Sequence, residues 1–151
     1  MYFLAPQYLP AVPDTVNDVL VLNLEAHLTN GHLFQVGGGH VIVSTAAKSI
    51  IDKYEVCPSM KWAPFQLEVN GESHAGYFRI SADQTIIVDM KRIEATWILE
   101  GKVIRGVEKW AFLSEPKYDL FYCDASTWLA SDGLAEELKR SLNCPSELCR
   151  V

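Results

Sequence analysis

The sequence predicts an α+β fold, with a mixed or mostly antiparallel sheet and two related strand–helix units packed on it. Segments that alternate with a period of two, or that are rich in β-branched residues, outnumber segments with helical spacing and follow one another along the chain. In addition, residues 120–146 repeat the pattern of residues 33–59 without a gap. The chain has 151 residues, which is the length of one domain, so we expect residues 1–151 to form a single domain.

The N-terminal segment 15–28 fits two structures. Asp14 is a suitable residue to cap a helix and Gly31 is a suitable residue to end one. The run Val19-Leu-Val-Leu22 would fit a strand equally well. Of the two, we expect the helix.

The first copy of the repeat indicates a strand, a cap, a helix and a stop. Val41-Ile-Val43 is a β-branched run typical of a buried strand, and Ser44 can accept a hydrogen bond from a free amide of a following helix. One apolar helix face is then expected from the residues at helical spacing, which are Ala46, Ala47, Ile50, Ile51 and Tyr54. Pro58 lacks an amide hydrogen, so Cys57-Pro58 should close the unit.

The second copy has the same order of features 87 residues later. The strand Trp128-Leu-Ala130 leads to Ser131, and Cys144-Pro145 ends the unit. Its apolar helix stripe consists of Leu134, Ala135, Leu138 and Leu142. The two copies share six identities in 27 positions: Leu33-Phe34 with Leu120-Phe121, Ser44 with Ser131, and Cys57-Pro58-Ser59 with Cys144-Pro145-Ser146.

Between the copies the sequence predicts strands and turns. Phe65–Val69 alternates, Asn70-Gly71 is a strong hairpin signal, and Tyr77–Ile80 continues as a strand. Further along, we expect a short buried strand at Thr85–Val88, a turn at Glu100-Gly101, extended structure over Lys102–Leu113 and a strand at Tyr118–Cys123. The cluster Gly37-Gly38-Gly39 precedes a strand, not a helix, so it predicts a plain turn and no phosphate cradle.

The charge of the chain indicates the class of its partner. It has 13 Lys and Arg against 19 Asp and Glu, a formal net charge of −6, which argues against binding nucleic acid. The first basic residue is Lys48, so Asp14, Asp18 and Glu25 stand without an offsetting charge. These three carboxylates are our candidate contacts for a basic partner. Trp62 and Trp110 are further candidates, because half-exposed Trp side chains often anchor interfaces, although either could belong to the core.

The sequence contains no pattern for a metal or a cofactor. The cysteines form no C-x-x-C pair and the histidines no helical zinc pair, so we expect neither a metal nor a cofactor. The N-terminus lacks the basic region of a secretory signal, and no apolar run reaches the roughly 18 residues that span a bilayer. We therefore expect a cytoplasmic protein with reduced thiols and no membrane partner.

Several short motifs resemble one bacterial domain family, whose members are often described as immunity proteins of polymorphic toxin systems. The matching residues are Ile42-Val43-Ser44 at a helix start and Asp119-Leu120-Phe121 in a later strand, and Val88-Asp89-Met90 resembles the middle segment. The second helix start departs from the pattern, with Ala130-Ser131 in place of Val-Ser. The resemblance covers about residues 33–146.

The resemblance implies a protein that is not an enzyme and that neutralises a cognate protein toxin by occluding it. The acidic balance agrees with a basic toxin. An alternative from another class is a small hydrolase or transferase that uses His40 or His74 with nearby carboxylates. A third is an assembly module that oligomerises through its aromatic residues. The sequence leaves the oligomeric state open.

Overall fold

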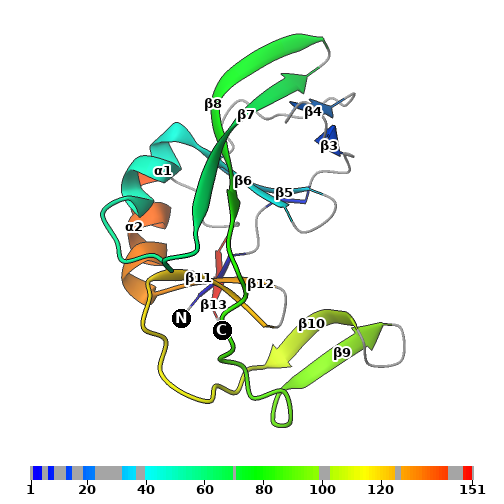
Figure 1. The fold of residues 1–151 in the computed structure, drawn as a ribbon, viewed down its shortest axis with the longest axis vertical. Helices are drawn as coiled ribbons and strands as arrows, with labels where there is room; N and C mark the ends of the chain where they lie inside the picture. Colours follow the sequence, from blue (N-terminus) through cyan, green and yellow to red (C-terminus); the bar gives the residue numbers. More distant parts are fainter. Residues whose placement is uncertain are drawn as a thin grey trace.

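The fold was analysed in a computed structural model, which describes residues 2–4, 7–8, 13–14, 19–22, 32–36, 40–69, 71–98, 103–124, 127–142 and 148–150. Within these residues two helices and several mainly antiparallel sheets occur, so the α+β prediction is confirmed. The helices lie together on one side of the molecule, and the sheets occupy the other side (Figure 1).

The largest sheet in the described residues has seven strands, with two parallel pairs among antiparallel ones. Its order is β2 (Gln7–Tyr8), β5 (Leu33–Val36), β6 (His40–Ser44), β8 (Glu72–Ser81), β7 (Lys61–Val69), β4 (Val19–Leu22) and β3 (Pro13–Asp14). The parallel pairs are β2 with β5 and β4 with β7. The long β7–β8 hairpin rises away from the helices at the top of Figure 1.

The other strands of the described residues form a four-stranded sheet and a separate hairpin. The four-stranded order is β11 (Leu120–Cys123), β12 (Thr127–Ala130), β1 (Tyr2–Leu4) and β13 (Leu148–Arg150). Because β1 pairs with β13, strands from the two ends of the chain lie side by side (Figure 1). The hairpin of β9 (Glu94–Ile98) and β10 (Val103–Lys109) projects at the opposite end from β7–β8.

Each helix follows a hairpin and begins after a serine, as the sequence predicted. Helix α1 (Thr45–Ile51) is capped by Ser44, whose Oγ accepts the amide hydrogen of Ala47 at 3.1 Å. Helix α2 (Asp132–Leu142) is capped by Ser131, whose Oγ accepts that of Leu134 at 3.3 Å. These bonds satisfy amides that the first turn of a helix leaves without a partner.

The two hairpin–helix units share strand register and capping bonds at the 87-residue offset, although α2 is longer than α1. Leu33 pairs with Val43 in the first hairpin, and Leu120 pairs with Ala130 in the second. The amide of each capping serine donates to the residue before the first strand, Ser44 to His32 at 2.9 Å and Ser131 to Asp119 at 2.8 Å. The sequence repeat therefore corresponds to a repeat of strand register and of capping bonds.

The main hydrophobic cluster draws on both units. From the first it takes Leu33, Val41, Val43, Ala47, Ile50 and Ile51, and from the second Leu120, Trp128, Ala130, Leu134, Ala135 and Leu138. A second cluster lies on the other face of β11 and β12 and contains Cys57, Ile87, Val88, Phe121, Cys123 and Leu129. Both faces of this hairpin are buried, which explains why its strands are nearly continuous apolar runs.

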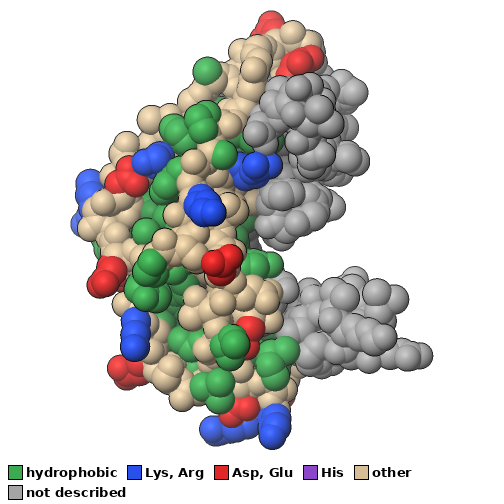
Figure 2. All heavy atoms as spheres, in the orientation of Figure 1, with side chains coloured by type: hydrophobic (Ala, Val, Ile, Leu, Met, Phe, Trp, Pro, Cys, Tyr) green, Lys and Arg blue, Asp and Glu red, His purple; other side chains and the backbone are tan. Residues whose placement is uncertain are grey.

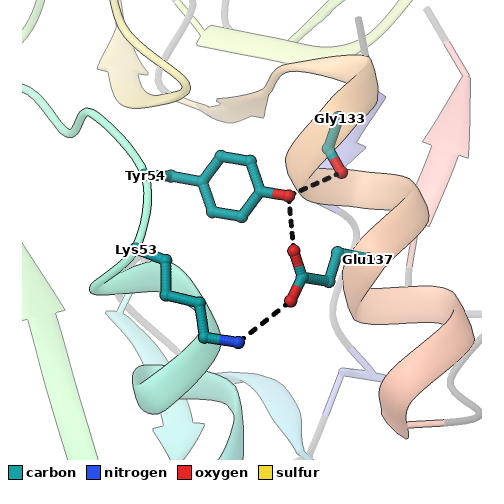
Figure 3. A network of polar contacts seen from close by, with 4 residues as sticks. All are labelled: Lys53, Tyr54, Gly133 and Glu137. Atoms are coloured by element: carbon teal, nitrogen blue, oxygen red, sulfur yellow. Dashed lines mark hydrogen bonds and ion pairs between the residues drawn. The ribbon is translucent and has the colours of Figure 1, made fainter.

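Polar contacts also join the turn that follows α1 to helix α2, as Figure 3 shows. The Tyr54 hydroxyl donates to Oε2 of Glu137 at 2.6 Å and lies 3.2 Å from the carbonyl oxygen of Gly133, while Lys53 Nζ lies 3.1 Å from Oε1 of Glu137. The Tyr54 hydrogen bond lowers the pKa of Glu137 and, by the same interaction, raises the pKa of Tyr54. The contacts fix the end of the first unit on the second.

Two glycines mark special positions of the β7–β8 hairpin. Gly71 follows Asn70 with a φ of +83°, as expected of the predicted hairpin turn. Gly76 has a φ of +91° at a register shift between Phe65 and Leu67 of β7, the position of a β-bulge. Its carbonyl oxygen accepts the Thr45 hydroxyl at 2.9 Å, which ties the bulge to the start of α1.

The helix expected over residues 15–28 is wrong for the part that the structure describes. Val19–Leu22 is strand β4, which lies parallel to β7 with Val19 opposite Gln66 and Leu22 opposite Val69. β7 offers this edge for hydrogen bonding, and the alternation of Val and Leu suits a strand. The rest of the segment lies outside the described residues, as do Gly37–Gly39, Glu100-Gly101 and Cys144-Pro145.

Two further predictions need correction. Helix α1 ends at Ile51, well before Cys57-Pro58, because a tight turn follows in which Tyr54 donates its amide hydrogen to the Ile51 carbonyl. Thr85–Val88 is not a strand but makes two isolated bridges, Thr85 to Cys123 and Val88 to Phe112. Ile87 and Val88 are buried as expected, whereas the Ile86 side chain is 80% exposed.

Candidate protein-binding surface

The two predicted tryptophans are half-buried and engaged within the chain. Trp62 on β7 packs edge-on against Phe78, with 6.2 Å between the ring centroids. Lys48 Nζ lies 4.7 Å from the centroid of the Trp62 ring. Trp110 stacks on Phe112 at 5.8 Å and packs against the second hydrophobic cluster. Both rings therefore contribute to packing as well as to the surface.

The predicted acidic contacts fall largely outside the described residues. Asp14 lies on β3, the outermost strand beside β4, while Asp18 and Glu25 are not described. Asp14 lies opposite Val19 of β4, and Val19 lies opposite Gln66 of β7. Asp14 is therefore two strands away from β7, at the level of Gln66. Trp62 lies at another level of β7 than Gln66, and Trp110 lies outside the strands of the seven-stranded sheet. This sheet therefore aligns neither tryptophan with Asp14.

The histidines that the structure describes lie in different environments. His32 is half-buried, and its Nδ1 lies 2.8 Å from Oγ of Ser44, so it belongs to the cap of α1. Burial lowers the pKa of His32 below its ordinary value of 6.5. His74 is exposed on β8 and His40 begins β6, whereas His27 is outside the described residues. No group of three His, Cys, Asp or Glu in the described part of the chain could hold a metal ion.

A hydrophobic patch is the surface feature that the sequence reasoning missed. The large hydrophobic side chains that the described residues expose are Ile86 (80%), Leu113 (61%) and Met90 (40%). They come from two segments, 85–90 and 111–113, that are hydrogen-bonded to each other, and we call these three residues the Ile86 patch. In Figure 2 the lower part of the molecule shows hydrophobic side chains beside carboxylates and basic groups. Gathered exposed apolar residues are typical of protein-interaction sites.

Backbone hydrogen bonds hold the two segments in place. Oδ1 of Asp124 accepts the amide hydrogens of Ile87 at 3.2 Å and Val88 at 3.0 Å. The Leu113 amide donates to the Ile87 carbonyl oxygen at 2.8 Å, and the Asp89 amide donates to that of Ala111, also at 2.8 Å. Ile86 is therefore presented by a chain segment that is fixed on both sides, not by a loose loop.

Two cavities share the lining Pro116–Tyr118, and Ile86 of the patch lines the first of them. The first has a volume of about 270 Å³, and its lining combines Ile86, Ile87 and Phe121 with polar residues such as Ser114 and Glu115. The second has a volume of about 250 Å³ and adds Asp119, Ser131 and Asp132, at the start of α2. The first cavity thus has more hydrophobic residues in its lining, and the second has more acidic ones.

The charges of the two cavities differ. Among the residues that line the first are one acidic residue, Glu115, and one basic residue, Lys117, whereas the second has two acidic residues, Asp119 and Asp132, against Lys117. Oδ2 of Asp119 also accepts the amide hydrogen of Glu55 at 3.0 Å, which fixes the orientation of this carboxylate. The second cavity therefore has the more negative lining.

One sequence signal could have indicated the patch. The run Ile86-Ile87-Val88 is apolar at three successive positions, and a strand buries all three only when both of its faces are covered. One of the three was therefore a candidate for exposure. Leu113 carried no comparable signal.

Compared with models of known protein families and with curated proteins, the chain matches none. In the described residues, no helix is long and apolar enough to cross a membrane.

Proposed function

We propose that this chain is a cytoplasmic, immunity-type protein that binds a cognate protein toxin and neutralises it by occlusion. The observation that carries the proposal is the Ile86 patch, because exposed apolar side chains on two hydrogen-bonded segments, one of which lines a hollow, suit a protein partner. The net charge of −6 supports a basic partner, since complementary charge speeds encounter. The motif resemblance supports a toxin as that partner.

Occlusion needs no reacting group on this chain. Ile86 and Leu113 would enter apolar contacts at the centre of the interface, and the charged residues around them would form its rim. Blocking the toxin surface would then follow from affinity and position alone. In this proposal the chain is not an enzyme and needs neither a metal nor a cofactor.

Co-expression with the product of the neighbouring gene tests the proposal. Cells that make this product alone should stop growing, and cells that also make the present chain should grow, with both proteins co-purifying. If the neighbouring product is harmless, or if protection and co-purification both fail, the proposed function is wrong.

Two substitutions test whether the patch is the contact. Ile86→Asp and Leu113→Asp should weaken toxin binding by about thirtyfold each, the loss of an interface hot spot. Both side chains are mainly exposed, so the free energy of unfolding should change by no more than about 0.5 kcal/mol. Ala75→Asp, at an exposed position of β8, adds the same charge elsewhere and should leave binding unchanged.

A further inference from the structure

We propose that the two cavities beside the Ile86 patch together recognise an apolar residue and a nearby Lys or Arg of one partner segment. The segment would cross the wall Pro116–Tyr118, placing its apolar side chain in the first cavity and its cation in the second. This inference rests on the proposed function for the identity of the partner, a basic protein. It adds which two side chains of that partner the chain recognises.

The first cavity fits the apolar half of the segment. Its volume of about 270 Å³ is enough for one large side chain, and Ile86, Ile87 and Phe121 contribute to its lining. Phe121 and Ile87 are buried members of the second hydrophobic cluster, so the cavity floor is a fixed part of the core. A bulky side chain that fills a preformed apolar pocket is the usual anchor of an interface.

The second cavity fits the cationic half. Its lining includes two acidic residues, Asp119 and Asp132, and one basic residue, Lys117, which also belongs to the lining of the first cavity. Asp132 lies in the first turn of α2, where its charge also offsets the positive end of the helix dipole. A cation therefore gains more in the second cavity than in the first, where one carboxylate and one ammonium balance.

The wall between the cavities is held by backbone bonds at its far end. The Asp119 amide donates to the Glu55 carbonyl oxygen at 2.6 Å, and the Ser131 amide donates to the Asp119 carbonyl oxygen at 2.8 Å. The separation of the two cavities is thereby set by the fold, so recognition should depend on the spacing of the two partner residues.

The test uses the full chain labelled with ¹⁵N and short blocked peptides as probes. The peptides contain one Phe and one Arg, either adjacent or separated by one or two glycines, in an otherwise glycine background. Matched controls replace Phe by Ala or Arg by Glu. At millimolar peptide, one spacing should shift amide signals of both cavities, such as those of Ile86 and Ser131, and either replacement should weaken binding at least threefold.

A pair of protein variants tests the acidic half. Asp119→Asn with Asp132→Asn should weaken binding of the Phe–Arg peptide by about three- to tenfold, as expected for two exposed ion pairs. Asparagine at 119 keeps an oxygen for the Glu55 amide, so the fold should persist. The control variant Glu72→Gln with Asp83→Asn removes the same charge at exposed positions outside the cavities and should bind as the unaltered chain does.

The outcomes separate this inference from the proposed function. Equal binding of the Arg and Glu peptides, or no shift at any spacing, would overturn the inference. Peptide binding with the expected preferences would support it even if no toxin were neutralised, in which case only the proposed function fails. Full protection from a toxin by the Asp119→Asn, Asp132→Asn variant with unchanged affinity would overturn the inference and leave the proposed function standing.

Discussion

The two helix caps allow a quantitative comparison within one chain. Ser44 and Ser131 hold equivalent positions at the 87-residue offset, and each accepts one amide hydrogen of its helix. They differ in one contact: Oγ of Ser44 also lies 2.8 Å from Nδ1 of His32, whereas the residue equivalent to His32 is Asp119, whose carboxylate accepts the Glu55 amide hydrogen. Substituting each serine by alanine therefore removes one capping bond, plus the histidine contact in the first case.

The expected magnitudes follow from these contacts. Loss of a capping hydroxyl destabilises a protein by about 1 kcal/mol, which we expect for Ser131→Ala. Ser44 is only 8% exposed, and its removal leaves the half-buried ring nitrogen of His32 without this partner, which adds about 1 kcal/mol. Ser44→Ala should therefore lower the free energy of unfolding by about 2 kcal/mol, which for a chain of this size is about 4–8 °C in Tm.

Urea unfolding followed by circular dichroism at pH 7.5 measures both losses. A double-mutant cycle of Ser44→Ala with His32→Ala should give a coupling energy of about 1 kcal/mol, because the two residues contact each other. Equal losses for the two serines, together with a coupling near zero, would refute the reasoning. The Ser131→Ala variant combined with His32→Ala serves as the control and should be additive.

The same histidine predicts a dependence on pH. Burial lowers the pKa of His32 below 6.5 in the folded chain, so the unfolded chain binds more protons between that lowered pKa and 6.5. The contribution of His32 to stability is therefore present above pH 6.5 and is lost as the pH falls through this window. The variant His32→Gln should lose less stability than the unaltered chain when urea unfolding is repeated across the window; an identical decline in both would contradict the assignment.

Three further predictions concern single residues of the fold. Gly76→Ala should destabilise by about 2 kcal/mol in urea unfolding and Gly71→Ala by about 1, since both have positive φ but only a Cβ at Gly76 meets a neighbour, at 3.3 Å. Asp124→Ala should destabilise by about 2 kcal/mol and speed amide exchange of the Ile86 segment, whereas Asp124→Asn, which keeps an acceptor oxygen, should do neither. The Tyr54 hydrogen bond lowers the pKa of Glu137 in the folded chain, so its contribution to stability is lost as the pH falls below about 4.5. Tyr54→Phe should make this loss of stability smaller, and an unchanged dependence of stability on acid pH would argue against it.

The local parts of the fold could be predicted from the sequence. The strand–serine–helix order of both units follows from interactions within a few residues: a β-branched or aromatic run, a hydroxyl that caps and an apolar stripe at helical spacing. The hairpin at Asn70-Gly71 is equally local, because a glycine with positive φ sets the turn. Such features need no knowledge of distant partners.

The parts that depend on distant partners could not be predicted. Val19–Leu22 is a strand because the edge of β7 pairs with it, and nothing near residue 19 reveals that edge. Thr85–Val88 is not a strand because the carboxylate of Asp124 binds the amides of Ile87 and Val88, which a neighbouring strand would otherwise take. The candidate surface was missed for the same reason, since its two segments meet only in the folded chain.

The shared hydrophobic cluster has a consequence for how the chain folds. Its residues from α1 and α2 are about 87 positions apart, so the core requires closure of a long loop, which slows folding relative to chains with local contacts. At a synthesis rate of about 5–20 residues per second, roughly 4–17 s pass between the synthesis of α1 and the synthesis of α2. Over this interval the apolar side chains of α1 lack the core partners that the second hairpin and α2 supply.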